Sequence, residues 1–262
     1  MLLEAGSGHS AGSLDLADIF TALYFHVLTQ NPHTPNDPKR DRVFLSAGHV
    51  CPVWYMTLAH AGYLPKHEAL TTLRKLGSRL QGHPHKKSLP PIENPSGPLG
   101  QGISQAAGYA LAAKMEGKKF ETFCIMGDGE QDEGQVWEAY MFAAANKLGN
   151  LTAIIDRNHI QIDGFTDDVM PLGQLRYKIE AFGWSVIDID GHNMKEIVDA
   201  CQRAKNISDT PVAIIAHTIP GKGVDFMEYK YEWHGIPPNE KQAKEALEDL
   251  RSLGKKIEGE HS

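Results

Sequence analysis

Short apolar runs alternate with segments of helical periodicity along most of this 262-residue chain. Runs of apolar, often β-branched residues predict buried strands at 122–126, 151–155, 185–189 and 212–216. Apolar residues spaced three and four apart predict helices at 14–28, 50–61, 102–115, 134–148, 172–182, 194–205 and 240–253. Because strands that alternate with helices form βαβ units, the pattern predicts an α/β fold, doubly wound, with a mostly parallel sheet and helices on both faces.

One long stretch, residues 76–98, has little periodicity and is rich in glycine, proline and histidine. Loops of this length inside a compact protein are more often functional than idle. No Pro/Ser-rich linker divides the chain, so we expect one domain over residues 1–262, with a peripheral helix and tail at 239–262.

Composition narrows the classes of partner. The net charge of −7, spread without long like-charge runs, argues against nucleic acid or an anionic membrane surface as the main partner. Three cysteines without a CxxC pair indicate reduced thiols in a cytoplasmic protein. No unbroken apolar run reaches the roughly 18 residues that a membrane span needs. We therefore expect a cytoplasmic protein without a membrane or nucleic-acid partner.

Polar side chains follow two neighbouring predicted strands. Asp128 lies in a Gly-Asp-Gly turn directly after one strand, and Asn158 follows the next strand, thirty residues later. Ligands of open α/β sheets bind beyond the carboxyl ends of the strands, so the two side chains are expected to meet in one crevice. Two oxygens alone make a weak metal site, and Mg²⁺ usually completes its shell with phosphate and water. The pattern therefore predicts a magnesium-diphosphate ligand.

These motifs and several others resemble one enzyme family. The sequence contains SGH at 7–9, DRVFLSAGH at 41–49, QGHP at 81–84, GPLGQG at 97–102, GDGEQDEG at 127–134, DRNHIQIDG at 156–164 and WHG at 233–235. Their order and spacing resemble the amino-terminal, diphosphate-binding half of transketolases over nearly the whole chain. The second half of that family, which binds the aminopyrimidine ring and most of the sugar phosphate, has no counterpart in these residues.

The resemblance implies the thiamine-diphosphate-binding fold, with thiamine diphosphate and Mg²⁺ as cofactors, or Ca²⁺ or Mn²⁺ in place of Mg²⁺. It implies that the side chains of Asp128 and Asn158 and the backbone carbonyl of Ile160 bind the metal. The other cofactor-binding residues that it implies are Gly127 and Gly129 of the Gly-Asp-Gly turn, Gly97, Pro98 and Leu99 of the glycine loop, and His49, Glu133 and His234.

The resemblance also implies which groups handle protons. Imidazole exchanges protons near neutral pH, and the family places histidines around the reacting carbons of the sugar. The matching residues here are His9, His49, His83 and His234. Glu133 matches a catalytic glutamate that meets a second glutamate from the partner domain across a subunit interface.

The reaction that the resemblance implies is transfer of a two-carbon ketol unit from a ketose phosphate to an aldose phosphate. Since the pyrimidine-binding half is missing, the implied partner is a carboxyl-terminal transketolase subunit, in a heterotetramer of two plus two chains. The chain would be active only with that partner.

Other functions stay open at this point. A calcium loop of the EF-hand type would need Gly at position six and Glu at position twelve, where this chain has Glu133 and Ala139. A non-catalytic module that binds magnesium-diphosphate is a second alternative. Within thiamine enzymes, a subunit like dihydroxyacetone synthase or like the α subunit of a 2-oxo-acid dehydrogenase is a third.

Overall fold

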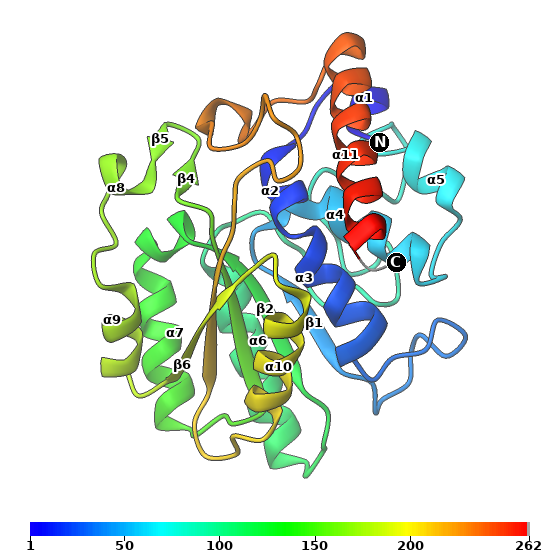
Figure 1. The fold of residues 1–262 in the computed structure, drawn as a ribbon. Helices are drawn as coiled ribbons and strands as arrows, with labels where there is room; N and C mark the ends of the chain where they lie inside the picture. The colour runs from blue at the N-terminus through cyan, green and yellow to red at the C-terminus, as the bar shows by residue number, and fades with distance from the viewer. Residues whose placement is uncertain (261–262) are drawn as a thin grey trace.

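A computed structural model describes residues 1–260 and shows a parallel sheet with helices on both sides (Figure 1). The sheet has five strands in the order β1-β2-β3-β7-β6, and every neighbouring pair is parallel. The strands are β1 (Arg42–Leu45), β2 (Thr122–Gly127), β3 (Leu151–Arg157), β6 (Ser185–Asp190) and β7 (Val212–His217). The predicted doubly wound α/β fold is confirmed.

Side chains of the central strands are buried on both faces, which explains why these strands appear in the sequence as continuous apolar runs. Val43 and Leu45 of β1 point into one core, and Phe44 points into the other. Helices α3 (Ala17–Ala22), α4 (Cys51–His60) and α10 (Met194–Lys205) contribute to the first core. Helices α6 (Gln101–Met115), α7 (Gly134–Ala145) and α9 (Leu175–Ala181) contribute to the second core.

The segment between α5 (Lys66–Thr71) and α6 runs along the outer edge of β1. Asn94 exchanges hydrogen bonds with the backbone of Leu45, and the Ser96 hydroxyl donates to the Leu45 carbonyl at 2.6 Å. Covering an edge strand removes its unpaired backbone groups from solvent. The same segment therefore closes the sheet and extends to the carboxyl end of β1.

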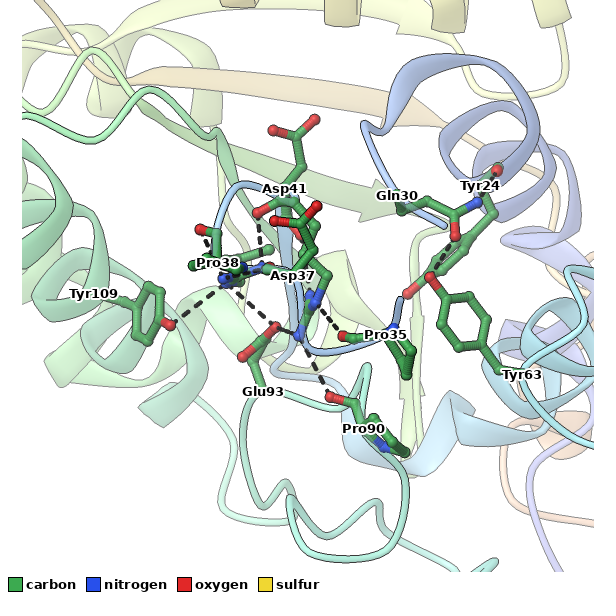
Figure 2. Close-up of polar contacts among 12 residues, drawn as sticks. Tyr24, Gln30, Pro35, Asp37, Pro38, Asp41, Tyr63, Pro90, Glu93 and Tyr109 are labelled. Atoms are coloured by element: carbon green, nitrogen blue, oxygen red, sulfur yellow. Dashed lines mark hydrogen bonds and ion pairs between the residues drawn. The ribbon is translucent and has the colours of Figure 1, made fainter. Parts of the chain in front are cut away.

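A buried ion cluster anchors this segment, as Figure 2 shows. The Glu93 carboxylate forms an ion pair with Arg40 and lies 3.7 Å from Nε of Arg42. Arg40 also donates to the carbonyls of Pro35 and Pro90, at 2.8 and 3.3 Å. Both arginines and the glutamate are buried, so they fix the segment to the start of β1.

The prediction of one continuous helix over residues 14–28 is wrong, because this range contains three separate elements. The chain forms α2 (Ala11–Asp15), then α3, then a π-helix, η1 (Leu23–Val27). Leu16 separates α2 from α3 with φ −87° and ψ 1°. The periodicity gives no sign of this break, because the buried Asp15 faces the strand ends rather than solvent.

Other boundaries differ from the predictions by smaller amounts. Strand β3 runs to Arg157, past the residues expected to follow its end, and α9 begins at Leu175 rather than at 172. The sequence did not predict α1 (Leu2–Ala5), α5, the two-stranded pair β4 (Ile160–Gln161) and β5 (Gly164–Phe165), or α8 (Thr166–Val169). These elements are two to six residues long, which is too short for a periodic pattern of apolar residues to be recognised.

The last helix, α11 (Glu240–Glu260), is longer than the predicted helix at 240–253. Its Ala246 and Leu250 pack on Val224 and Met227 of the preceding loop, which contains one 3-10 turn, η4 (Tyr231–Trp233). Of the helix and tail predicted at 239–262, the last two residues, 261–262, lie outside the described residues. Within residues 1–260, no helix is both long and apolar enough to cross a membrane.

Candidate active site

The carboxyl ends of β2 and β3 bring together the two polar residues that the sequence singled out. Gly127 pairs with Asp156, so the chain leaves both strands at the same level of the sheet. The buried Asp128 carboxylate accepts hydrogen bonds from the backbone N–H groups of Gly129 and His159, at 2.7 and 2.8 Å. It also forms an ion pair with Arg157 at 2.8 Å.

The side chain of Asn158 is held by hydrogen bonds to the carboxyl groups of Asp15 and Asp156. Its amide Nδ2 donates to Asp15 at 2.8 Å and to Asp156 at 3.3 Å. Its Oδ1 accepts from the Ile160 N–H at 3.1 Å. Because only the amide nitrogen can donate to the two carboxylates, these bonds fix the orientation of the amide, and its oxygen points away from Asp15 and Asp156. Asp15 also accepts from the Gly221 N–H at 2.6 Å, which ties α2 to the loop after β7.

A cleft of about 410 Å³ opens in front of these residues. Nearly all of the predicted site residues line it, namely His9, His49, His83, Gly97, Leu99, Gly127, Asp128, Gly129, Asn158, Ile160 and His234. The structure thus brings these residues together from seven separate motifs. The predictions for Pro98 and Glu133 differ in placement, because neither residue lines the cleft and both side chains face solvent.

Three of the four predicted histidines form a compact group. The ring centroids of His9 and His49 are 4.9 Å apart, those of His49 and His234 are 5.1 Å apart, and those of His9 and His234 are 5.6 Å apart. His83 lies across the cleft against Gly48 and Gly97, where a Cβ atom on Gly48 would come within 3.2 Å of its ring.

The histidines are neutral near physiological pH. Burial, followed by the charges of His234, Arg74 and His83, lowers the pKa of His9 to about 4. Burial also lowers the pKa values of His49, His83 and His234. A neutral imidazole can accept a proton at one nitrogen and donate one at the other. The group is therefore suited to proton exchange with a sugar.

The end of the cleft nearest the carboxyl ends of β2 and β3 is acidic. Burial raises the pKa of Asp128 to about 6, against the opposing effect of Arg157, and raises the pKa of Asp156 to about 8. Burial and the nearby Asp156 raise the pKa of Asp15 well above its ordinary value. A diphosphate would be repelled by ionised carboxylates here unless a cation lay between them. The donor set of carboxylate, amide and carbonyl oxygens is of the kind that Mg²⁺ and Ca²⁺ prefer.

Buried polar atoms also point to a ligand. Among the residues that the structure describes, Nδ1 of His9 and Nδ1 of His234 have no hydrogen-bond partner although both atoms are buried. Unpaired buried polar groups are rare in folded proteins and require an explanation. A bound cofactor or sugar hydroxyl in the cleft would supply the missing partners, so the residues fit a polar ligand.

Glu130 is a residue of the cleft that sequence reasoning missed. Its buried carboxylate accepts from the Gly100 N–H at 2.5 Å, from the Gly127 N–H at 3.1 Å and from the Ser46 hydroxyl. The Ser46 hydroxyl in turn accepts from the Gly102 N–H at 3.0 Å. Glu130 thus links the glycine loop to the ends of β1 and β2. Its place directly after Gly-Asp-Gly was the only signal in the sequence.

Glycine is required where this loop packs. A Cβ atom on Gly102 would lie 2.4 Å from Cβ of Ser46, and one on Gly100 would lie 2.9 Å from Cβ of Glu133. Gly100 also has φ 79°, in the left-handed region that favours glycine. The glycine pattern of GPLGQG is therefore explained by close approach to β1 and to the start of α7.

The fold and the cleft define an α/β protein that binds its ligand beyond the strand ends, with metal-type oxygens on one side and histidines on the other. Residues 1–254 match the family described as "Transketolase, thiamine diphosphate binding domain". The chain therefore belongs to the transketolase family, as its thiamine diphosphate-binding domain.

Two similar curated proteins are transketolase subunits of comparable length. The chain is 44% identical to the 6-deoxy-6-sulfo-D-fructose transketolase subunit of Clostridium sp. (strain MSTE9), over 96% of this chain and 91% of that protein. It is 39% identical to an apulose-4-phosphate transketolase subunit of Phocaeicola vulgatus, over 100% of this chain and 92% of that protein. The prediction of an amino-terminal subunit of a split transketolase is confirmed, and the names of these relatives, as subunits, imply a second chain as partner.

A solved transketolase has the same fold. The crystal structure of transketolase from Campylobacter jejuni matches with a TM-score of 0.89 and 37% identity, over 94% of this chain. The match spans only 40% of that longer chain. The present chain thus corresponds to less than half of a transketolase that is made as one polypeptide.

Proposed function

We propose that this chain supplies the metal- and diphosphate-binding half of an active site that transfers a two-carbon ketol unit from a ketose phosphate to an aldose phosphate. One observation carries this proposal: oxygen ligands at the ends of β2 and β3 share a single cleft with His9, His49, His83 and His234. A binding module without catalysis would have no need for neutral histidines opposite the metal oxygens.

The cofactor would be held at the edge of the sheet. The side chains of Asp128 and Asn158 and the carbonyl of Ile160 would bind Mg²⁺, which Ca²⁺ or Mn²⁺ could replace. Gly127 and Gly129 would lie along the diphosphate. The thiazolium ring would contact Gly97, Leu99, His49 and His234, which line the cleft, whereas Pro98 faces away from it. Thiamine diphosphate, when bound, supplies the carbon nucleophile that makes cleavage between carbons 2 and 3 of a ketose possible.

The protein itself would position the sugar and move its protons. A neutral histidine can take the proton from the hydroxyl on carbon 3 as the adjacent bond breaks, and can return a proton to the carbonyl oxygen of the acceptor aldose. His9 and His234 each have an unpaired buried nitrogen for such contacts. The closely packed imidazoles disfavour charge on one another, which keeps them available as bases.

A partner chain would complete the site. Several large apolar side chains are exposed, namely Ile162 in the lining of the cleft and Met141, Phe142 and Met170 elsewhere, each more than two-fifths exposed. Exposed apolar patches mark protein interfaces. Glu133 faces solvent at the start of α7 and could meet a glutamate of the partner, and the glutamate that activates the aminopyrimidine would come from the partner too. We propose a heterotetramer of two plus two chains, because twofold assemblies are the commonest.

The substrate would be a sugar with an anionic end. The names of the two relatives contain a phosphate group in one case and a sulfo group in the other. A sulfonated ketose is therefore a second candidate donor beside a ketose phosphate. We further propose that residues 1–262 form one domain that acts in the cytoplasm.

Reconstitution tests this function. The chain is mixed with a pyrimidine-binding transketolase subunit, thiamine diphosphate and Mg²⁺, and ketol transfer from xylulose 5-phosphate to ribose 5-phosphate is measured. We expect transfer by the mixture and none by either chain alone. Full turnover by the isolated chain would refute the need for a partner, and absence of transfer from every phosphorylated or sulfonated ketose would refute the proposed reaction.

A further inference from the structure

The amide of Asn158 can bind a metal only through its oxygen, and a rotation of the amide group would place its nitrogen there instead. Hydrogen bonds decide which of the two atoms faces the cleft. The nitrogen donates to Asp15 at 2.8 Å and to Asp156 at 3.3 Å, and the oxygen accepts from the Ile160 N–H at 3.1 Å. An amide oxygen has two lone pairs, so the Asn158 oxygen keeps one for a ligand in the cleft.

The two carboxyl groups that hold the Asn158 nitrogen differ in their position. Asp156 lies on β3, two residues before Asn158, and it lines the cleft, where a ligand can touch it directly. Asp15 lies at the end of α2, is fully buried and does not line the cleft. An effect of Asp15 on a ligand in the cleft must therefore pass through the residues that Asp15 contacts.

Asp15 is itself held in a defined position. The oxygen that does not bind the amide accepts from the Gly221 N–H at 2.6 Å. Gly221 has φ 74°, and a Cβ atom there would lie 2.6 Å from Cβ of Met227, so this part of the loop has little freedom to move. At the start of α2, the Ser10 hydroxyl donates to the Ile236 carbonyl at 2.7 Å. Helix α2 is therefore attached to the loop after β7 at two points, and the carboxyl group of Asp15 stays in place.

A fixed ligand favours Mg²⁺ over Ca²⁺. Mg²⁺ requires nearly ideal octahedral geometry at about 2.0–2.1 Å, whereas Ca²⁺ accepts oxygens at about 2.3–2.6 Å in flexible arrangements. The Asp128 carboxylate is also fixed, by the N–H groups of Gly129 and His159 and by Arg157. Both side chains that would bind the metal are thus rigid, and loss of rigidity in Asn158 should weaken the binding of Mg²⁺ more than that of Ca²⁺.

We propose that Asp15 is a positioning residue that directs the Asn158 oxygen toward the metal and thereby makes the cleft prefer Mg²⁺ over Ca²⁺. This inference rests on the proposed function, in which Asn158 binds the metal of thiamine diphosphate. Asp15 touches neither the metal nor the cofactor. It acts by accepting from the amide nitrogen, because an amide that lost this acceptor could turn its N–H groups toward the cation.

Calorimetry of thiamine diphosphate binding to the reconstituted complex, first with Mg²⁺ and then with Ca²⁺, tests the proposal. Asp15→Asn keeps the size of the side chain but replaces one acceptor oxygen with a donor, although both partners of Asp15 are donors. The affinity with Mg²⁺ should fall by about 10- to 100-fold, the range for a lost supporting residue, and the affinity with Ca²⁺ by no more than about threefold. Asp15→Leu, which has no acceptor, should show the same difference between the metals.

Asp41→Asn is the matched control. Asp41 is also buried and accepts from the backbone N–H groups of Thr29 and Glu121, at 2.9 and 2.8 Å. It lies directly before β1, at the opposite end of the sheet from the cleft. Asp41→Asn should lower the free energy of unfolding without changing the ratio of the affinities with Mg²⁺ and Ca²⁺. Equal weakening with both metals in Asp15→Asn, or weakening with neither, would overturn the proposal.

Asn158→Ala separates a failure of this inference from a failure of the proposed function. If this variant binds thiamine diphosphate with either metal as tightly as the unsubstituted chain, then Asn158 is not a ligand, and the metal site and the role of Asp15 are both refuted. If Asn158→Ala weakens binding while the ratio of the affinities is unchanged in Asp15→Asn, only the role of Asp15 is refuted.

A second measurement needs neither metal nor partner. The side-chain amide signals of Asn158 are assigned by NMR in the isolated chain through their absence from Asn158→Ala. These hydrogens should exchange with solvent at least about tenfold faster in Asp15→Leu than in the unsubstituted chain or in Asp41→Asn, because their shorter hydrogen bond is lost. Equal exchange rates in the three proteins would contradict the positioning role of Asp15.

Discussion

The long segment between α5 and α6 is built differently at its two ends. Near Glu93 the buried charges are paired inside the protein, because Arg40 and Arg42 lie against the carboxylate and donate other N–H groups to backbone carbonyls and to the Tyr109 hydroxyl (Figure 2). Near His83, by contrast, Arg74 is exposed to solvent and has no ion-pair partner among the described residues, and Nδ1 of the neighbouring His9 is buried without a hydrogen-bond partner. The paired end holds the segment in place, and the unpaired end leaves polar groups available to a ligand.

The largest effect should come from His83 at the unpaired end and from His234, which lines the same cleft. His83→Ala and His234→Ala in the reconstituted enzyme should each lower the chemical step by roughly 10²–10⁴, the usual cost of losing a general acid or base. The affinity for thiamine diphosphate should change little, as measured by calorimetry. A loss of melting temperature in proportion to the loss of activity would instead indicate a structural histidine.

A substitution at the paired end should lower the free energy of unfolding and should not act on the chemical step directly. Glu93→Ala leaves two buried arginines without a carboxylate, which should cost about 3–5 kcal/mol in the free energy of unfolding. Urea denaturation of the chain measures this cost. Glu4→Ala removes an exposed partner of Lys75 and serves as the control with almost no expected change. Similar effects of the two substitutions would remove the distinction between the two ends.

Glu130 shares a property with each end of the segment, because its carboxylate has three hydrogen-bond donors inside the protein and yet lines the cleft. Glu130→Ala removes the acceptor for Gly100, Gly127 and Ser46, so the glycine loop should lose its fixed position and thiamine diphosphate should bind at least about tenfold more weakly. Gln131→Ala is the matched control, because Gln131 is buried on the same turn but its side chain donates to the Gly127 carbonyl and accepts from the Tyr140 hydroxyl. Equal weakening in both variants would mean that general disruption of the turn explains the loss.

The smallest effect concerns pH. The unfolded chain takes up a proton at His9 near pH 6.5, whereas the folded chain does so only near pH 4, since burial and then the neighbouring charges depress its pKa. The free energy of unfolding should therefore fall as pH decreases from about 6.5 to about 4, because the unfolded chain binds this proton first. His9→Asn should flatten that decline in urea denaturation curves at several pH values. An unchanged slope would show that His9 does not contribute.

Most of the sheet could be predicted because its central strands are buried on both faces and so form unbroken apolar runs. The positions of Asp128 and Asn158 then followed from the rule that parallel strands end at one edge of a sheet. The break between α2 and α3 could not be predicted, because it depends on Asp15 reaching Asn158 and Gly221, which lie 143 and 206 residues away.

The contacts of individual side chains were less accessible than their motifs. Glu130 looks like any first-turn carboxylate in the sequence, and only the folded structure shows that three donors converge on it. Arg74 stands in a segment with two other cations, and nothing in the sequence tells which of the three lacks a partner. Contacts between residues far apart in the sequence decide which of these charged groups are paired, and periodicity carries no information about such contacts.

The most direct test of the metal site at the strand ends is calorimetry of thiamine diphosphate binding to the reconstituted complex, with and without Mg²⁺, for the unsubstituted chain, Asp128→Ala and Asn158→Ala. We expect tight binding only with Mg²⁺ in the unsubstituted chain, and weakening by at least about 100-fold in either variant, beyond the range seen when only a supporting residue is lost. Circular dichroism should show that both variants remain folded. Unchanged, Mg²⁺-dependent affinity in both variants would contradict the assignment of the metal ligands.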